Sequence, residues 1–223
     1  MSYGVFKSAV DESLHANTVV VGSLGSGAGF FVENFIKELE QHKNNTDVQY
    51  IKYRGEIGSE PLNAYSTVHI TRVYSLSAAF EKVLSSIEER LALLDKKNCS
   101  NIQEYNSLAD RHLQAKVFII TKFDVLLKRC KDVSAAERTW QDILEQGEKT
   151  GVSLMVVQSH TALEVIPYVK NFPVRICYYC DEQVSRELLG SDIAHTLIPR
   201  GNEVYKYNST KPELGILKCS LTA

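Results

Sequence analysis

The sequence predicts an α/β fold in which a mostly parallel central sheet is flanked by helices. Short apolar strands alternate with amphipathic helices along the chain, and this alternation is typical of βαβ units. The chain has 223 residues, which suits one domain with a full hydrophobic core. We therefore expect residues 1–223 to form a single domain.

The first half of the chain predicts three strands and three helices. Thr18–Val21 is apolar and β-branched, as buried strands are, and the apolar residues of Phe31–Leu39 recur at helical spacing. Met1–Ala16, in contrast, has no pattern that predicts an element. The remaining expectations are a strand over Val48–Tyr53, a glycine-containing loop over Arg54–Ser66, a strand over Val68–Val73, and helices over Leu76–Leu94 and Ile102–His112.

The second half continues the alternation. Lys116–Thr121 is apolar and β-branched, which predicts a central parallel strand. Ser134 and Glu137 have the spacing of a capping box that opens a helix to Lys149, and Gly151 is placed to end it. The remaining expectations are strands over Val152–Val157, Val174–Cys180, Val204–Tyr207 and Gly215–Leu221, and short helices over Leu163–Val169 and Asp181–Leu189.

The composition is that of an ordinary globular protein, with 44% hydrophobic residues, 23% charged residues and a formal net charge of −2. It offers no basic excess that would favour nucleic acid or an anionic membrane as a partner. The longest apolar runs fall short of the roughly 20 residues that a spanning helix needs. Met1–Leu14 is polar, so we expect no signal peptide there.

Five cysteines, an odd and scattered set, fit a reducing cytosol. Cys177 and Cys180 have the spacing of a redox or zinc pair. Within the expected strand, however, residues three apart point to opposite faces, so we interpret them as buried strand cysteines. No metal site is expected.

Residues 22–29, Gly-Ser-Leu-Gly-Ser-Gly-Ala-Gly, have the form of a phosphate-binding loop without its reactive side chains. In the pattern G-x-x-x-x-G-K-[ST], backbone N–H groups cradle phosphates, the Lys reaches the β and γ phosphates, and the hydroxyl binds Mg²⁺. Ala28 and Gly29 stand where the Lys and the hydroxyl residue belong. The loop is therefore either a vestigial nucleotide site or an ordinary connection between a strand and a helix, and its members are Gly22, Gly25, Ser26, Gly27, Ala28 and Gly29.

Several further segments follow one another in a characteristic order. They are Ile87–Leu94 with Asn101–Asn106, Val117–Leu127, Thr150–Val157, Leu163–Ile166, Val174–Ile176 and Ser185–Leu189. In order and spacing they resemble the motor domain of FtsK/SpoIIIE-type ATPases, over about Thr18 to Tyr207. The resemblance implies a RecA-like P-loop NTPase fold and favours the vestigial interpretation of the glycine loop.

The departures from the family pattern concern its chemistry. The resemblance places a metal-orienting Asp where this chain has Thr121 and a catalytic Glu where it has Lys122, both expected on strands adjacent to the loop. Ser159 stands where a Gln senses the γ-phosphate, and Gln158, one residue early, is expected to face the other way. Since four parts of phosphoryl transfer are missing, we expect no catalytic residue. We expect ATP and Mg²⁺ to bind weakly at most, with Lys122 as a candidate substitute for the missing cation.

Within the family, the chain most resembles the C-terminal, third ATPase domain of the type VII secretion coupling proteins EssC and EccC. The resemblance implies a pseudo-ATPase fragment of a larger membrane protein, acting in substrate recognition or in regulation of neighbouring modules during protein export. The implied partners are ATPase domains of the same chain and small helical WXG-type substrates, without nucleic acid. The implied location is the cytoplasmic face of the bacterial cell membrane, reached through membrane segments of the parent protein. The alternative functions are a weakly active NTPase and a nucleic-acid-binding module related to DNA translocases.

Two sets of aromatic residues are relevant to ligand binding, one at the glycine loop and one that could line a substrate groove. Phe30 and Phe31 stand where the loop meets its helix and are placed to pack over an empty nucleotide site. A groove for a helical substrate needs exposed apolar residues. Its candidates are Tyr168, Phe172, Tyr178 and Tyr179, although packing in the core is the simpler interpretation of these four.

Overall fold

The central sheet has eight strands within the part of the chain that the structure describes. The computed structural model describes residues 3–41, 46–54, 65, 68–158, 163–198, 203–208 and 213–218. The sheet order is β3-β2-β4-β5-β1-β6-β7-β8. The strands are β1 (Thr18–Val21), β2 (Asp47–Tyr53), β3 (Val68–Val73), β4 (Lys116–Thr121), β5 (Val152–Gln158), β6 (Val174–Cys177), β7 (Glu203–Asn208) and β8 (Glu213–Lys218).

The strand directions confirm the predicted, mostly parallel sheet. Strands β1 to β6 pair in parallel with their neighbours. Strand β7 runs antiparallel to β6, and β8 runs antiparallel to β7. Parallel strands end at one common edge, and the register pairs Val21 with Gln158 and Thr121 with Val157 at that edge. The ends of β1, β4 and β5 are thereby brought into one row.

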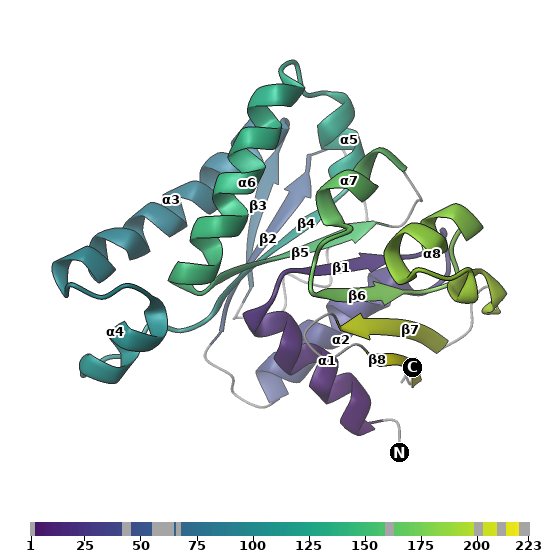
Figure 1. The fold of residues 1–223 in the computed structure, drawn as a ribbon, viewed down its shortest axis with the longest axis horizontal. Helices are drawn as coiled ribbons and strands as arrows, with labels where there is room; N and C mark the ends of the chain where they lie inside the picture. The colour runs from purple at the N-terminus through teal and green to yellow at the C-terminus, as the bar shows by residue number, and fades with distance from the viewer. Residues whose placement is uncertain are drawn as a thin grey trace.

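Helices cover both faces of the sheet (Figure 1). Helices α1 (Tyr3–His15) and α2 (Ala28–Gln41) lie on one face, and most of the others lie on the opposite face. Alternate strand residues enter two apolar cores, as shown by Val20 in one core and Val19 and Val21 in the other. The other helices are α3 (Leu76–Lys96), α4 (Ile102–Leu108), α5 (Phe123–Lys128), α6 (Val133–Thr150), α7 (Ile166–Val169) and α8 (Glu182–Leu189), with short 3₁₀ turns at Leu163–Val165 and Ile193–Thr196.

Some predicted boundaries are wrong for local reasons. The N-cap of α6 is Asp132, two residues before the expected Ser134, because Asp132 Oδ1 accepts the Ala135 N–H at 2.9 Å. Helix α5 follows β4 where no helix was predicted, and α1 occupies a segment that had no predicted element. Gly151 ends α6 in the left-handed conformation, as expected. Most of the expected loop over Arg54–Ser66 lies outside the described residues.

Candidate functional site

The glycine loop connects the end of β1 to the start of α2 and is bonded to the strands on both sides. The Gly22 N–H donates to the Gln158 carbonyl at the end of β5 (3.1 Å). The Ser23 N–H donates to the Tyr179 carbonyl, just after β6 (2.7 Å). Gly25 and Gly27 have φ of 79° and 110°, a left-handed backbone that favours glycine. These contacts hold the loop at the edge where the parallel strands end.

Tyr178 packs directly beneath the loop. A Cβ added to Gly22 would meet the Tyr178 Cβ at 2.8 Å, and one added to Gly27 would meet the Tyr178 ring at 3.0 Å. The Tyr178 side chain is almost fully buried. Ser26 is buried as well, and its Oγ has no hydrogen-bond partner among the described residues. The loop is thus packed closely against its own Ser26 and against Tyr178, which directly follows β6.

The two positions that should supply the cation and the metal ligand supply neither. Ala28 is buried in the core beneath α2. Gly29 is exposed, and nothing lies within 4 Å of where its Cβ would be. The expected aromatic cover is wrong: Phe31 is fully buried and packs on Phe35, with ring centroids 6.3 Å apart, while Phe30 is 54% exposed.

The second motif ends β4 at the same edge. Thr121 is buried, and Lys122 has a left-handed backbone with φ of 52° where α5 begins. The prediction that this motif lies on a strand adjacent to the loop is wrong, because β5 lies between β4 and β1. Strand order arises from tertiary packing, which sequence patterning leaves open. Lys122 and the loop are therefore separated by the width of one strand.

Gln158 fills the space between the two motifs. Its Nε2 donates to Asp124 Oδ1 (3.0 Å), and its Oε1 accepts from the N–H groups of Phe123 (2.8 Å) and Asp124 (3.0 Å). The side chain therefore faces the first turn of α5 and joins β5 to the β4 motif. Ser159, the other sensor-like position, lies outside the described residues.

Cys177 and Cys180 are both buried in the core, as predicted, and neither forms a disulfide. The argument from opposite strand faces is wrong, because β6 ends at Cys177 and both residues belong to the same apolar core. Burial raises the pKa of the Cys177 thiol and raises the pKa of Cys180 to about 12. The two thiols are therefore kept neutral at physiological pH.

The aromatic residues considered for a substrate groove are largely interior. Phe172 and Tyr178 are 2% exposed and Tyr168 is 9% exposed. Tyr168 and Phe172 pack against Trp140, whose Nε1 donates to the Tyr168 carbonyl (3.1 Å). Tyr179 is partly exposed, and its ring stacks on His195 at 5.6 Å. These four residues do not form an exposed apolar groove.

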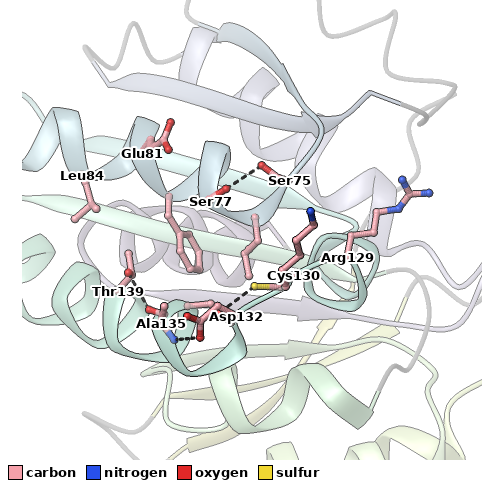
Figure 2. A pocket seen from close by; sticks show the side chains of 13 residues that line it. Ser75, Ser77, Glu81, Leu84, Arg129, Cys130, Asp132, Ala135 and Thr139 are labelled. Atoms are coloured by element: carbon pink, nitrogen blue, oxygen red, sulfur yellow. Dashed lines mark hydrogen bonds between the residues drawn. The ribbon is translucent and has the colours of Figure 1, made fainter.

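A groove that the sequence did not predict lies between α3 and α6. It encloses about 530 Å³ and is lined by the first turns of α3, the turn from Arg129 to Asp132, and the first half of α6 (Figure 2). We call it the α3–α6 groove. Leu76, Phe80 and Leu84 form a stripe along α3, in which Leu76 and Phe80 are buried and Leu84 is only partly covered. How far α6 covers this stripe depends on where α6 begins, which the sequence misplaced.

The described residues contain neither a metal-binding cluster nor a membrane-spanning helix. Nowhere in them do three or more His, Cys, Asp or Glu side chains gather as a metal ion would require. None of the helices there combines the length and hydropathy needed to cross a bilayer.

Sequence comparison gives distant relatives. No protein-family model matches the chain. DNA translocase FtsK from Staphylococcus aureus (strain Mu50) is 24% identical over 218 residues, covering 89% of this chain and 27% of the relative. FtsK from Treponema pallidum is also 24% identical, over 88% of the chain and 26% of the relative. The chain thus spans about a quarter of the length of these curated relatives.

Solved structures show the same fold. The cytoplasmic domain of the type VII secretion ATPase EccC from Thermomonospora curvata superimposes with a TM-score of 0.77 at 16% identity, covering 91% of this chain and 25% of that one. EssC (ATPases 2 and 3) from Geobacillus thermodenitrificans gives 0.68 at 16% identity, covering 92% and 39%. The chain therefore has a P-loop NTPase fold. The resemblance to FtsK/SpoIIIE-type ATPase domains is confirmed, and the EccC and EssC ATPase domains are among its structural neighbours.

Proposed function

We propose that this chain is a catalytically inactive FtsK/SpoIIIE-like domain of a type VII secretion coupling protein. In this role it recognises substrates or regulates neighbouring ATPase modules during protein export. The sequence similarity to FtsK supports the ATPase ancestry, and the fold shared with EccC and EssC favours the secretion branch. A membrane-bound parent would place the domain at the cytoplasmic face of the bacterial cell membrane.

The observation that carries this proposal is the replacement of both phosphoryl-transfer motifs. Ala28 contributes only a methyl group to the core, and Gly29 has no side chain with which to bind Mg²⁺. At the end of β4, Thr121 and Lys122 provide neither a metal-binding carboxylate nor a base for the attacking water. The carboxylate nearest to them in the motif, Asp124, bonds to Gln158. Each such loss removes several kcal/mol of transition-state stabilisation.

Titration with labelled ATP tests the loss of catalysis. We expect no saturable binding at micromolar ATP with or without Mg²⁺, and no phosphate release, whereas an FtsK motor domain assayed alongside gives both. ATP turnover that disappears in Lys122→Ala would instead assign the chain as a weak NTPase. Lys97→Ala, which changes an exposed lysine at the end of α3, is the control variant.

Two further measurements separate recognition from the translocase alternative. A recognition or regulatory domain binds a small helical WXG-type substrate, or alters the ATP turnover of the neighbouring module to which it is joined. A module related to DNA translocases would instead bind duplex DNA with an affinity that falls steeply with salt. DNA binding of that kind, without substrate binding, would contradict the proposed function.

A further inference from the structure

The α3–α6 groove has a long apolar lining that is partly exposed. Leu76, Phe80 and Leu84 recur every four residues on α3, so they extend over about 12 Å of its length. Ala135 and Ala136 line the wall that α6 provides. Leu76, Phe80 and Ala136 are buried, whereas Leu84 and Ala135 are partly exposed. The volume of about 530 Å³ lies within the range of roughly 300–1,000 Å³ that is typical of ligand pockets.

The hydroxyl groups of the lining are already hydrogen-bonded within the protein. Thr139 Oγ1 donates to the Ala135 carbonyl (3.0 Å), and the Ser75 and Ser77 hydroxyls are bonded to each other (3.0 Å). Polar groups placed along the groove would therefore find few partners in these hydroxyls. A hydrocarbon chain needs none, and it gains by removing the exposed apolar surface from water.

Positive charge lies at one end of the groove. Arg129 and Lys131 are exposed, and neither forms an ion pair with any other described residue. The Arg129 guanidinium lies over the Tyr53 ring, 5.1 Å from its centre. Stacking of this kind uses the face of the guanidinium and leaves its N–H edge for an acceptor, and a carboxylate fits that edge with two parallel hydrogen bonds.

The two acids of the lining do not cancel this charge. Figure 2 shows Glu81 across the opening from Arg129. The Asp132 carboxylate lies at the cationic end, where it caps α6 by accepting the Ala135 N–H at 2.9 Å. The groove is thus apolar along its length, cationic at one end and anionic at the other.

We propose that the α3–α6 groove binds a long-chain fatty acid, a ligand with one hydrocarbon chain and one carboxylate. The chain lies over Phe80 and Leu84, and the carboxylate accepts hydrogen bonds from Arg129 beside the ammonium group of Lys131. Charge fixes this direction, because the Glu81 carboxylate repels an anion at the opposite end. The inference goes beyond the proposed function and does not depend on it.

Isothermal titration calorimetry of the whole chain with dodecanoate, kept below its micelle concentration, tests the site. We expect saturable binding of one dodecanoate per chain, and a loss of about fourfold in affinity for each methylene removed in decanoate and octanoate. Dodecyltrimethylammonium has the same chain and the opposite charge, and it should bind about tenfold more weakly than dodecanoate. Equal affinities for octanoate and dodecanoate, or for the two dodecyl compounds, would overturn the proposal.

Two variants locate the ligand in the groove. Ala135→Phe fills the space between the helices and should weaken dodecanoate binding tenfold or more. Arg129→Gln/Lys131→Gln should weaken dodecanoate binding about fivefold without weakening that of dodecyltrimethylammonium, because only the attraction for the carboxylate is lost. Lys97→Gln, which changes an exposed lysine at the far end of α3, is the matched control and should leave both affinities unchanged.

The possible failures can be told apart. Full affinity for dodecanoate in Ala135→Phe, with the fold retained in thermal unfolding, would place the ligand elsewhere and overturn the site. Cosedimentation with phosphatidylglycerol vesicles, but not with phosphatidylcholine vesicles, by a chain that does not bind dodecanoate would show that a membrane surface is recognised instead. That result also overturns the proposal. None of these outcomes alters the result of the ATP titration, so the proposed loss of catalysis stands or fails separately.

Discussion

The glycine loop and the α3–α6 groove are built in opposite ways. At the loop, Tyr178 approaches so closely that even a methyl group at Gly22 would meet it at 2.8 Å. At the α3–α6 groove, the side chains leave an open space of about 530 Å³ between the two helices. The loop retains its glycines but has lost the side chains that act on phosphate, whereas the groove retains apolar surface and charge.

This difference shows where the two regions can tolerate change. A backbone in close contact with a neighbouring strand depends on the absence of side chains, so its residues are constrained by packing even where the chemistry is gone. The groove depends on walls that stay in place without filling the space between them. Contacts outside the groove must therefore hold α3, and Arg90 provides them.

The largest effect is expected at Arg90, which anchors the groove wall α3 to the start of β4 and β5. Its Nη1 donates to the Thr150 and Gly151 carbonyls (2.8 and 3.1 Å), and its Nη2 donates to the Gln114 carbonyl (2.6 Å). Arg90→Met leaves these acceptors without their charged donor and should lower the free energy of unfolding by about 3 kcal/mol or more. Urea denaturation measures this loss.

The control for Arg90 is an arginine with the same change on an exposed surface. Arg138→Met on α6 should alter stability by less than about 0.5 kcal/mol. Equal losses in the free energy of unfolding from the two substitutions would show that Arg90 does not anchor α3. The argument that contacts outside the groove hold its walls in place would then be wrong.

The next effect is expected at Gly22. The added methyl group of Gly22→Ala would clash with Ser26 Oγ and with the Tyr178 Cβ, so we expect a loss of about 2 kcal/mol in the free energy of unfolding. Ser26→Ala in the same chain should recover part of that loss, because it removes one of the two clashing atoms. A Gly22→Ala chain as stable as the wild type would mean that the loop is loosely packed.

A smaller effect follows from the thiols beside the loop. The pKa of Cys180 is raised to about 12, above its ordinary value of 9.0, so the folded state favours the neutral thiol. This contribution is fully present below pH 9 and is lost as the pH rises from 9 towards 12, by at most about 1.4 kcal/mol per pH unit. Stability measured across this range should fall less steeply in Cys180→Ala than in the wild type.

Sequence patterning predicted the elements better than their arrangement. Strand β4 occupies the expected Lys116–Thr121, because a continuous β-branched run has few alternatives to a buried strand. The position of β5 between β1 and β4 could not be predicted, since strand order depends on which apolar faces pack together. Helix α5 was missed because the residue before it, Lys122, has a left-handed backbone, and the sequence there has no glycine or asparagine to indicate such a turn. The α3–α6 groove was missed because it depends on where α6 begins and on how far α6 covers α3.

The smallest effect is expected at Gly29, where the loop is open instead of closely packed. A Cβ there meets nothing within 4 Å, and the residue lies in the first turn of α2. Gly29→Ser should therefore raise the free energy of unfolding by about 0.5 kcal/mol, because serine favours a helix more than glycine does. The change also restores a hydroxyl at the metal-binding position, yet we expect no gain in affinity for Mg-ATP, since Ala28, Thr121 and Lys122 are unchanged. Because the variant is expected to be at least as stable as the wild type, weak binding could not be attributed to misfolding. A clear gain in affinity would show that the loop needs only one side chain to hold a nucleotide.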